Sequence, residues 1–297
     1  FILSIKDNKS IGYLLAISAS VIFSSKAVFV KLAYSYNADT LSVLVLRMGF
    51  ALPIYIFIHL YRSKAEDKID ISKKDWLIMI AMGIIGYYLS SYLDFLGLQY
   101  ISANLERLLL FIYPTLTTIL AAIVLKQKIT MRKWLAIAVC YAGIFISFYK
   151  HNSADDSKDM WLGVFLVFMS ALTYSFYLIG SDKLIPKYGA ARFTTYIMIV
   201  SCIVVLIHFF AQMPAKFFDF EWQVYALGLT LAVFCTVLPT YMVGEAIKRL
   251  GASTTSILSS AGPVSVIFLS MFVLGESVTV FHLIGTAVVI FGISLIK

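Results

Sequence analysis

The feature that most constrains this chain is an internal repeat that contains no gap. Residues 89–146 recur 149 positions later, so that Pro114 corresponds to Pro263. Most positions exchange one apolar residue for another, and twelve are identical: Leu89/Leu238, Tyr92/Tyr241, Ala103/Ala252, Pro114/Pro263, Leu120/Leu269, Val124/Val273, Leu125/Leu274, Thr130/Thr279, Ala138/Ala287, Val139/Val288, Gly143/Gly292 and Ile144/Ile293. A repeat of this length predicts two halves with related folds.

The composition places this repeat in a membrane. Hydrophobic residues make up 61% of the 297 positions, mean hydropathy is +0.90, and only 13% of residues are charged. A water-soluble domain of this size would not be so apolar, so we expect a polytopic membrane protein. The net charge of +8 comes from basic residues in short loops, and we therefore expect no nucleic-acid partner.

Ten apolar runs are long enough to cross about 30 Å of bilayer at about 1.5 Å per residue. They lie at 11–34, 40–61, 75–97, 102–125, 131–150, 161–183, 190–211, 222–247, 253–274 and 280–297. The predicted fold class is an all-α membrane protein with ten transmembrane helices. Residues 1–150 form the first five-helix repeat, and residues 151–297 form the second.

Lysine and arginine are concentrated at one side of the predicted membrane. One set of alternate loops, together with both ends of the chain, holds nearly all of those outside the apolar runs, whereas the other set holds only Lys150, Lys158 and Lys216. The excess predicts cytoplasmic termini, in the inner (cytoplasmic) membrane of a bacterium. Because each half has an odd number of helices, the second half is predicted to be inverted relative to the first. Inverted repeats are typical of alternating-access carriers.

Five ionisable residues interrupt the apolar runs of the first half: Lys26, Arg47, Asp94, Glu106 and Arg107. Burying each of them alone would cost on the order of 3 kcal/mol. One interpretation is a structural ion-pair network, or cations that reach the outer surface. The other is a vestibule in which cations outnumber carboxylates, which would suit a substrate with a carboxylate or another anionic group.

Several other residues join this candidate substrate-binding site. Asp94 and Glu106 are candidates for proton coupling, because a carboxyl group in a low-dielectric cavity can titrate near neutral pH. Tyr92 and Tyr241 are matched by the repeat, and they and Tyr113 either contact the substrate or belong to helix packing and interfacial belts.

Pro114 and Pro263 occupy matched positions, where each frees a backbone carbonyl and predicts a hinge or a discontinuity. Just ahead of Pro263 lies a run of small hydroxyl residues that favours close helix packing and could also contact substrate. The run consists of Ser253, Thr254, Thr255, Ser256, Ser259 and Ser260.

The sequence contains none of the common motifs of metal sites, hydrolases or nucleotide-binding proteins that we considered. The four histidines are scattered without metal-ligand spacing, and no HExxH, GxSxG or P-loop pattern occurs. We therefore predict no cofactor, no metal and no enzymatic activity. A channel is the remaining alternative to a carrier.

The chain resembles the ten-helix EamA-type branch of the drug/metabolite transporter superfamily over essentially its whole length. The similar motifs are Phe23-Ser24-Ser25 followed by Val30-Lys31-Leu32, Arg47 within Leu46–Phe50, and Pro263 followed by Gly275-Glu276. Ala142-Gly143 and Phe291-Gly292 match the pattern at the ends of helices five and ten. The first copy departs from the family at Lys126-Gln127, where Gly-Glu is usual.

This resemblance implies a central cavity enclosed by helices of both halves. It implies a secondary transporter that exports or exchanges small metabolites such as amino acids, or toxic compounds. The basic vestibule leaves open an alternative, a carrier for phosphorylated metabolites or nucleotide-sugars. Fold alone does not fix the substrate.

Overall fold

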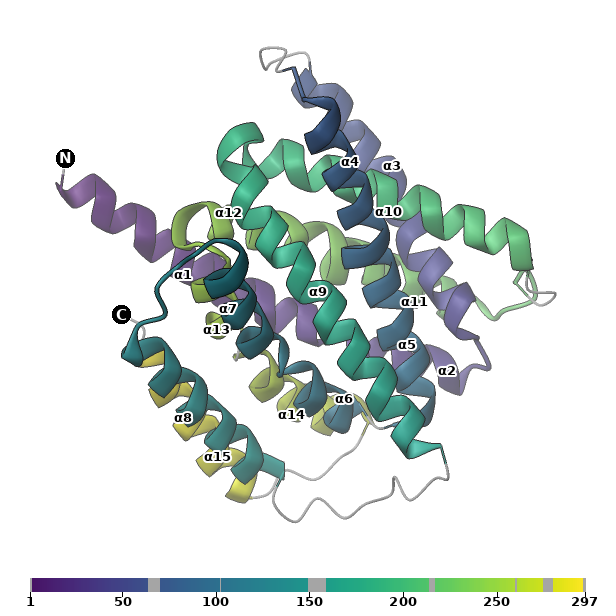
Figure 1. Cartoon of the computed structure of the whole chain (residues 1–297). Coiled ribbons are helices and arrows are strands. Elements are labelled where there is room, and N and C mark those ends of the chain that lie inside the picture. Colours follow the sequence, from purple (N-terminus) through teal and green to yellow (C-terminus); the bar gives the residue numbers. More distant parts are fainter. Residues whose placement is uncertain are drawn as a thin grey trace.

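The computed structural model describes residues 2–63, 70–101, 103–148, 159–213, 217–259, 261–274 and 280–295. These residues form helices joined by short connections, and no β-strand occurs among them (Figure 1). The α-helices and two π-helical segments are α1 (Ile2–Ser24), α2 (Lys26–Ser35), α3 (Thr40–Ser63), α4 (Lys73–Ala81), η1 (Met82–Leu89), α5 (Ser90–Tyr100), α6 (Ala103–Leu110), α7 (Tyr113–Val124), α8 (Met131–Phe148), α9 (Met160–Tyr188), α10 (Ala190–Gln212), α11 (Trp222–Ala232), η2 (Val233–Val237), α12 (Leu238–Leu250), α13 (Ala252–Leu258), α14 (Ala261–Leu274) and α15 (Val280–Ser294).

Six helical stretches in the described ranges are long and apolar enough to cross a membrane. They are Lys9–Ser35, Thr40–Arg62, Lys73–Tyr100, Met160–Tyr188, Ala190–Gln212 and Trp222–Leu250. The other four predicted segments are also helical, but α8 and α15 are shorter, and the segments 102–125 and 253–274 are each divided in two. The prediction of membrane-length helices is thus confirmed for six segments.

The exterior of the bundle is apolar, and its interior holds buried polar side chains among the apolar ones. Phe57, Phe165, Ile207 and Phe272 are all more than half exposed. Arg47 and a set of hydroxyl side chains are completely buried: Ser42, Thr117, Thr118, Ser175, Ser181, Thr194, Ser201 and Thr236. A protein surrounded by lipid has this distribution, because hydrocarbon solvates apolar side chains and cannot satisfy polar ones.

The interruptions of the helices follow the internal repeat. The π-helical segments η1 and η2 occupy matched positions in the two copies, and so do the break between α6 and α7 and the break between α13 and α14. In the second copy the π-helical segment ends two residues before Pro239, which lies in the first turn of α12 and cannot donate a backbone hydrogen bond. In the first copy Gly86 lies in η1, and a Cβ added there would come within 2.6 Å of Tyr177 in α9.

Pro114 begins a helix rather than kinking one. It lies in the first turn of α7, where a backbone N–H would have no helical partner in any case. Pro263 lies at the matching place in the first turn of α14. The predicted discontinuity is therefore present at both positions, while the predicted role of these prolines as hinges stays a prediction. The second-copy motif Gly275-Glu276 lies outside the described residues.

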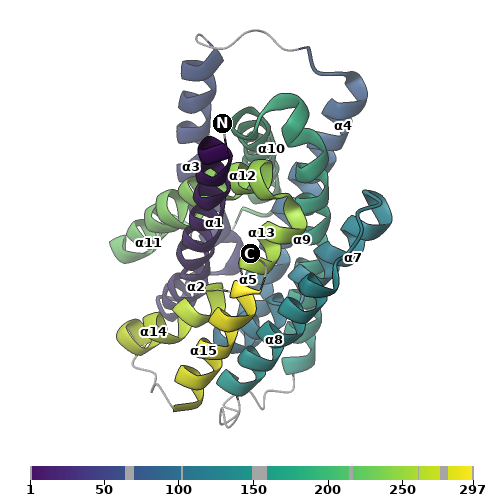
Figure 2. The same cartoon turned by 90° about the vertical axis from the view of Figure 1, so that its left-hand side faces the viewer.

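Two pairs of helices that are related by the same offset of 149 residues, α8 with α15 and α3 with α10, pack against each other in antiparallel fashion. At the α8–α15 contact, Gly143 faces the backbone of Gly285 and Val289, whereas the earlier residue Cys140 faces Gly292 (Figure 2). Residue numbers thus rise along one helix while they fall along the other. The α3–α10 contact behaves in the same way, since His59 lies against Tyr196 and Met48 lies against Cys202.

Other contacts between the halves are related by exchange of the two copies. Helix α5 packs along α9, and α1 packs along α12 (Figure 1). With the offset of 149 residues, α5 corresponds to α12 and α1 corresponds to α9, so each contact is the counterpart of the other. Helix α7 packs on α13, and the hydroxyl groups of Thr118 and Ser253 lie 3.2 Å apart there. The two halves therefore enclose a common centre, where the predicted charged residues lie.

Candidate functional site

A small cavity lies inside the bundle, and polar, aromatic and aliphatic side chains from both halves of the sequence form its walls. Its volume is about 50 Å³, which is room for a few water molecules and too little for an organic metabolite. It is lined by Ala19, Ser20, Phe23, Ser24, Lys26, Tyr87, Ser90, Ser91, Arg107, Leu110, Phe111, Tyr113, Ser170, Tyr174, Val243 and Ser259. The cavity is therefore narrow in this conformation.

Two of the predicted cations, Lys26 and Arg107, line this cavity. Lys26 is the first residue of α2, directly after the interruption at Ser25, and it pairs with Asp94 of α5. Arg107 Nε lies 3.0 Å from Glu106 Oε2 on α6. All four side chains are at most 6% exposed, so each charge is held in a low-dielectric setting by a charge of the opposite sign.

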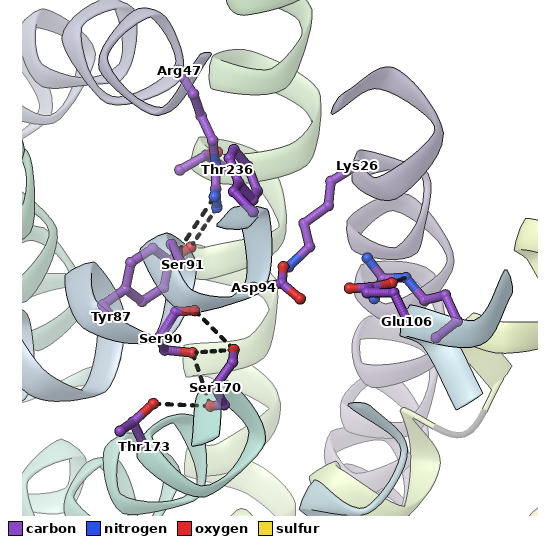
Figure 3. Close-up of polar contacts among 12 residues, drawn as sticks. Lys26, Arg47, Tyr87, Ser90, Ser91, Asp94, Glu106, Ser170, Thr173 and Thr236 are labelled. Carbon is purple, nitrogen blue, oxygen red and sulfur yellow. Dashed lines mark hydrogen bonds and ion pairs between the residues drawn. The ribbon is translucent and has the colours of Figure 1, made fainter. Parts of the chain in front are cut away.

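The two ion pairs form one cluster. The carboxyl groups of Asp94 and Glu106 point toward each other between Lys26 and the ribbon of α6 (Figure 3). One donor of this cluster is unused, because Arg107 Nη2 has no hydrogen-bond partner among the described residues. A buried guanidinium nitrogen without an acceptor next to a cavity is suited to a ligand oxygen.

Arg47 belongs to a separate group of neutral partners. Its Nε donates to Thr236 Oγ1 at 2.6 Å, and its terminal nitrogens lie 3.4 Å from Ser91 Oγ and from the Tyr87 hydroxyl. The guanidinium also lies over the Phe95 ring, 5.2 Å from its centroid. Arg47 thus joins α3 to η2 and α5, and it forms no ion pair with a carboxylate in the described ranges.

Hydroxyl groups form the rest of the polar wall. Ser170 Oγ donates to the Ser90 carbonyl at 2.8 Å, and Ser90 Oγ lies 3.1 Å from Ser170 Oγ (Figure 3). Ser20 Oγ donates to the Ser259 carbonyl at 2.5 Å, which joins α1 to the end of α13. Such groups can bind a polar solute without adding charge.

Three predicted tyrosines lie in three different places. Tyr113 lines the cavity, edge-to-face with Tyr174 at 5.4 Å between ring centroids. Tyr92 instead faces His208 of α10 at 5.1 Å. Tyr241 lines a different groove beside Arg62, and its hydroxyl lies 2.7 Å from Thr195 Oγ1. The matched tyrosines therefore do not meet at the centre.

The sequence interpretation missed part of the cavity wall. Ser20, Ser90, Ser91 and Ser170 were not expected at the site, although each interrupts an apolar run. A serine in a membrane helix is also a common packing residue, and so its presence alone does not distinguish the two roles. In the described part of the chain, no group of His, Cys, Asp and Glu side chains is arranged to hold a metal ion.

An apolar exterior, membrane-length helices and a cavity lined by buried charged and hydroxyl side chains are typical of an integral membrane protein of the solute-transporter class. Residues 10–149 and 161–297 match the model of the EamA-like transporter family. The chain belongs to this family, which confirms the resemblance found in the sequence.

Known relatives agree with this assignment. The uncharacterized transporter YcbK of Bacillus subtilis is 29% identical, over 95% of this chain and 91% of the relative. The uncharacterized transporter sll1319 of Synechocystis is 22% identical, over 96% of this chain and 93% of the relative. A solved crystal structure has the same fold, with a TM-score of 0.77, 14% identity, and coverage of 96% of this chain and 97% of the other. These names and the family indicate a transporter rather than an enzyme.

Proposed function

We propose that this protein is a secondary transporter that exports or exchanges amino acids or related small organic solutes by alternating access. The observation that carries the proposal is the narrow cavity lined by Lys26 and Arg107, with hydroxyl groups and tyrosines around them. A solute carboxylate would bind Arg107 Nη2, the donor that has no partner among the described residues. The aromatic walls would contact its apolar part.

The architecture supports a two-repeat mechanism. We propose ten crossings in two inverted halves, 1–150 and 151–297, in a bacterial cytoplasmic membrane with both termini on the cytoplasmic side. Antiparallel packing of α3 on α10 and of α8 on α15 is what inversion requires. The matched breaks before α7 and α14 divide these helices beside the cavity, where Pro114 and Pro263 would act as hinges.

The cavity volume bears on the transport cycle. Because about 50 Å³ cannot hold an amino acid, solute binding requires the lining helices to separate. The breaks at Ser25 and before α7 allow half-helices to tilt without loss of long hydrogen-bonded stretches. Protons are the proposed coupling ion, since Asp94 and Glu106 face each other and one of them could carry a proton through the cycle.

A carrier of phosphorylated metabolites is the second candidate, favoured by the excess of one cation among the five buried charges around the central cavity. Counterflow in proteoliposomes separates the candidates. Amino acids should drive saturable exchange of a labelled amino acid, and phosphate esters should not compete with it. Arg107→Gln should abolish exchange, whereas Lys73→Gln, a matched loss of charge on an exposed residue, should not.

If phosphate esters alone compete, the second candidate replaces the first. Flux that does not saturate and shows no counterflow would identify a channel. Proton coupling is tested by imposing a proton gradient, which should change the net flux of wild type but not of Glu106→Gln. Equal responses of the two proteins would exclude a coupling role for Glu106.

A further inference from the structure

A second cavity lies away from the central one, where α1, α8, α12 and α13 meet. Its volume is about 300 Å³, at the lower end for small-molecule sites. It is lined by Lys9, Tyr13, Thr130, Arg132, Lys133, Arg249, Leu250 and Thr254. Four of these side chains are cationic and none is acidic, so we call this cavity the basic pocket.

Few carboxylates balance these four cations. Arg249 forms an i,i+4 ion pair with Glu245, with Nη2 2.8 Å from Oε1. Asp182 is near Lys133 and offsets part of its charge, while its two oxygens accept from the Ala252 amide at 2.7 Å and from Gln127 Nε2 at 2.9 Å. Lys9, Arg132 and Lys133 form no ion pair with a carboxylate in the part of the chain that the structure describes. The pocket therefore keeps an excess of positive charge.

The neutral groups of the pocket suit an oxyanion. Tyr13, Thr130 and Thr254 bring hydroxyl groups to the same wall as the cations. Lys133 Nζ lies 3.3 Å from Ser253 Oγ. This hydrogen-bond partner is neutral, so a bound anion would give Lys133 a partner of opposite charge. A phosphate group offers several oxygens and a charge near −2, which matches several cations and hydroxyls converging on one small volume.

We propose that the basic pocket binds a phosphate group, from the headgroup of an anionic phospholipid or from a soluble phosphate ester. Trp134 follows Lys133 and is partly exposed, as an aromatic residue at the membrane–water interface would be. Basic pockets between membrane helices bind anionic headgroups in this way. Because α1 and α8 belong to one half and α12 and α13 to the other, bound phosphate joins the two halves.

Thermal unfolding of the purified full-length chain tests the site. Phosphatidylglycerol in mixed micelles should raise the melting temperature of wild type, and phosphatidylcholine should raise it less. In Arg132→Gln/Lys133→Gln, the apparent affinity should fall about 25-fold, since each cation near an anionic surface contributes about 5-fold. The matched control is Lys73→Gln/Lys74→Gln, which removes two exposed cations from the first turn of another helix and should behave as wild type.

The source of the phosphate is decided by a parallel titration with sn-glycerol 3-phosphate and with glycerol. A shift with phosphatidylglycerol alone assigns the site to lipid, and a shift with glycerol phosphate alone assigns it to soluble esters. Lys9→Gln, an exposed change that should leave folding intact, should lower the affinity about 5-fold on its own. Equal affinity in wild type, Lys9→Gln and the double variant would overturn the proposal.

Discussion

The charged residues at the centre of this protein differ in how much stability the protein would lose if each were replaced. Lys26, Asp94, Glu106 and Arg107 are paired with one another, whereas Arg47 relies on neutral hydroxyls and an aromatic ring. Loss of one member of a buried pair leaves the other charge without compensation. Loss of a neutral partner leaves only an unsatisfied hydrogen bond.

Removal of Lys26 should therefore affect stability as well as transport. We expect Lys26→Met to reduce the free energy of unfolding by about 3–5 kcal/mol, because Asp94 remains buried without its partner. Lys26→Met/Asp94→Leu removes both charges and should recover most of this loss in thermal denaturation. Transport by the double variant should stay absent if Lys26 binds solute, and recovery of transport would assign the pair a structural role only.

The Arg47 contacts allow a milder test. Thr236→Val removes the acceptor of Arg47 Nε, and we expect a loss of about 1–3 kcal/mol, because a buried charged donor is left unsatisfied. Thr230→Val changes a hydroxyl that bonds only its own helix, at Ala226, and should be close to neutral. Similar melting temperatures for the two variants would show that the Arg47–Thr236 bond contributes nothing measurable.

At the scale of the helices, periodicity predicted where apolar segments lie but not where they break. The ranges 40–61 and 190–211 nearly coincide with α3 and α10. Within the π-helical segment η1, Gly86 lies against Tyr177, a contact between distant parts of the chain that local hydropathy does not encode. At the site, the charged cluster was predictable, because burying a charged side chain in a membrane has a high free-energy cost. The cavity serines were not predictable, because serine is a common packing residue in membrane helices.

The α8–α15 contact depends on its matched glycines. A Cβ at Gly143 would lie 2.7 Å from the Gly285 carbonyl oxygen, a backbone atom that cannot move aside. Gly143→Val should therefore cost about 1–3 kcal/mol, measured as a lower melting temperature in detergent. Gly49 has nothing within 4 Å of the added Cβ, and Gly49→Ala should be neutral or stabilising. An equal effect at both positions would contradict this account of the interface.

Pro114 should influence transport more than stability. Alanine is tolerated in the first turn of a helix, so Pro114→Ala should change the melting temperature little. If α7 pivots at this break, a continuous helix through residues 111–113 will slow exchange in proteoliposomes. Pro53→Ala, inside α3 on its exposed side, is the matched control. Unchanged exchange rates in Pro114→Ala would rule out a hinge at this position.

At the scale of the whole molecule, the proposed orientation can be measured directly. The three native cysteines are free and buried, so they give little background for labelling. An impermeant maleimide should label Ser35→Cys in intact cells and should label Lys74→Cys only after permeabilisation. Both positions are exposed. The reverse pattern would place the basic loops outside and contradict the proposed topology.

The two copies of the repeat share the positions of their helices but not their charged residues. Asp94, Glu106 and Arg107 correspond to Val243, Thr255 and Ser256, so the charged cluster has no counterpart across the pseudo-symmetry of the bundle. In the proposed cycle, the inward-open and outward-open forms place this one cluster in different surroundings, and their energies are therefore unequal. An empty carrier of this kind has a preferred resting form and unequal apparent affinities at its two faces, while gradients alone determine how far solute accumulates.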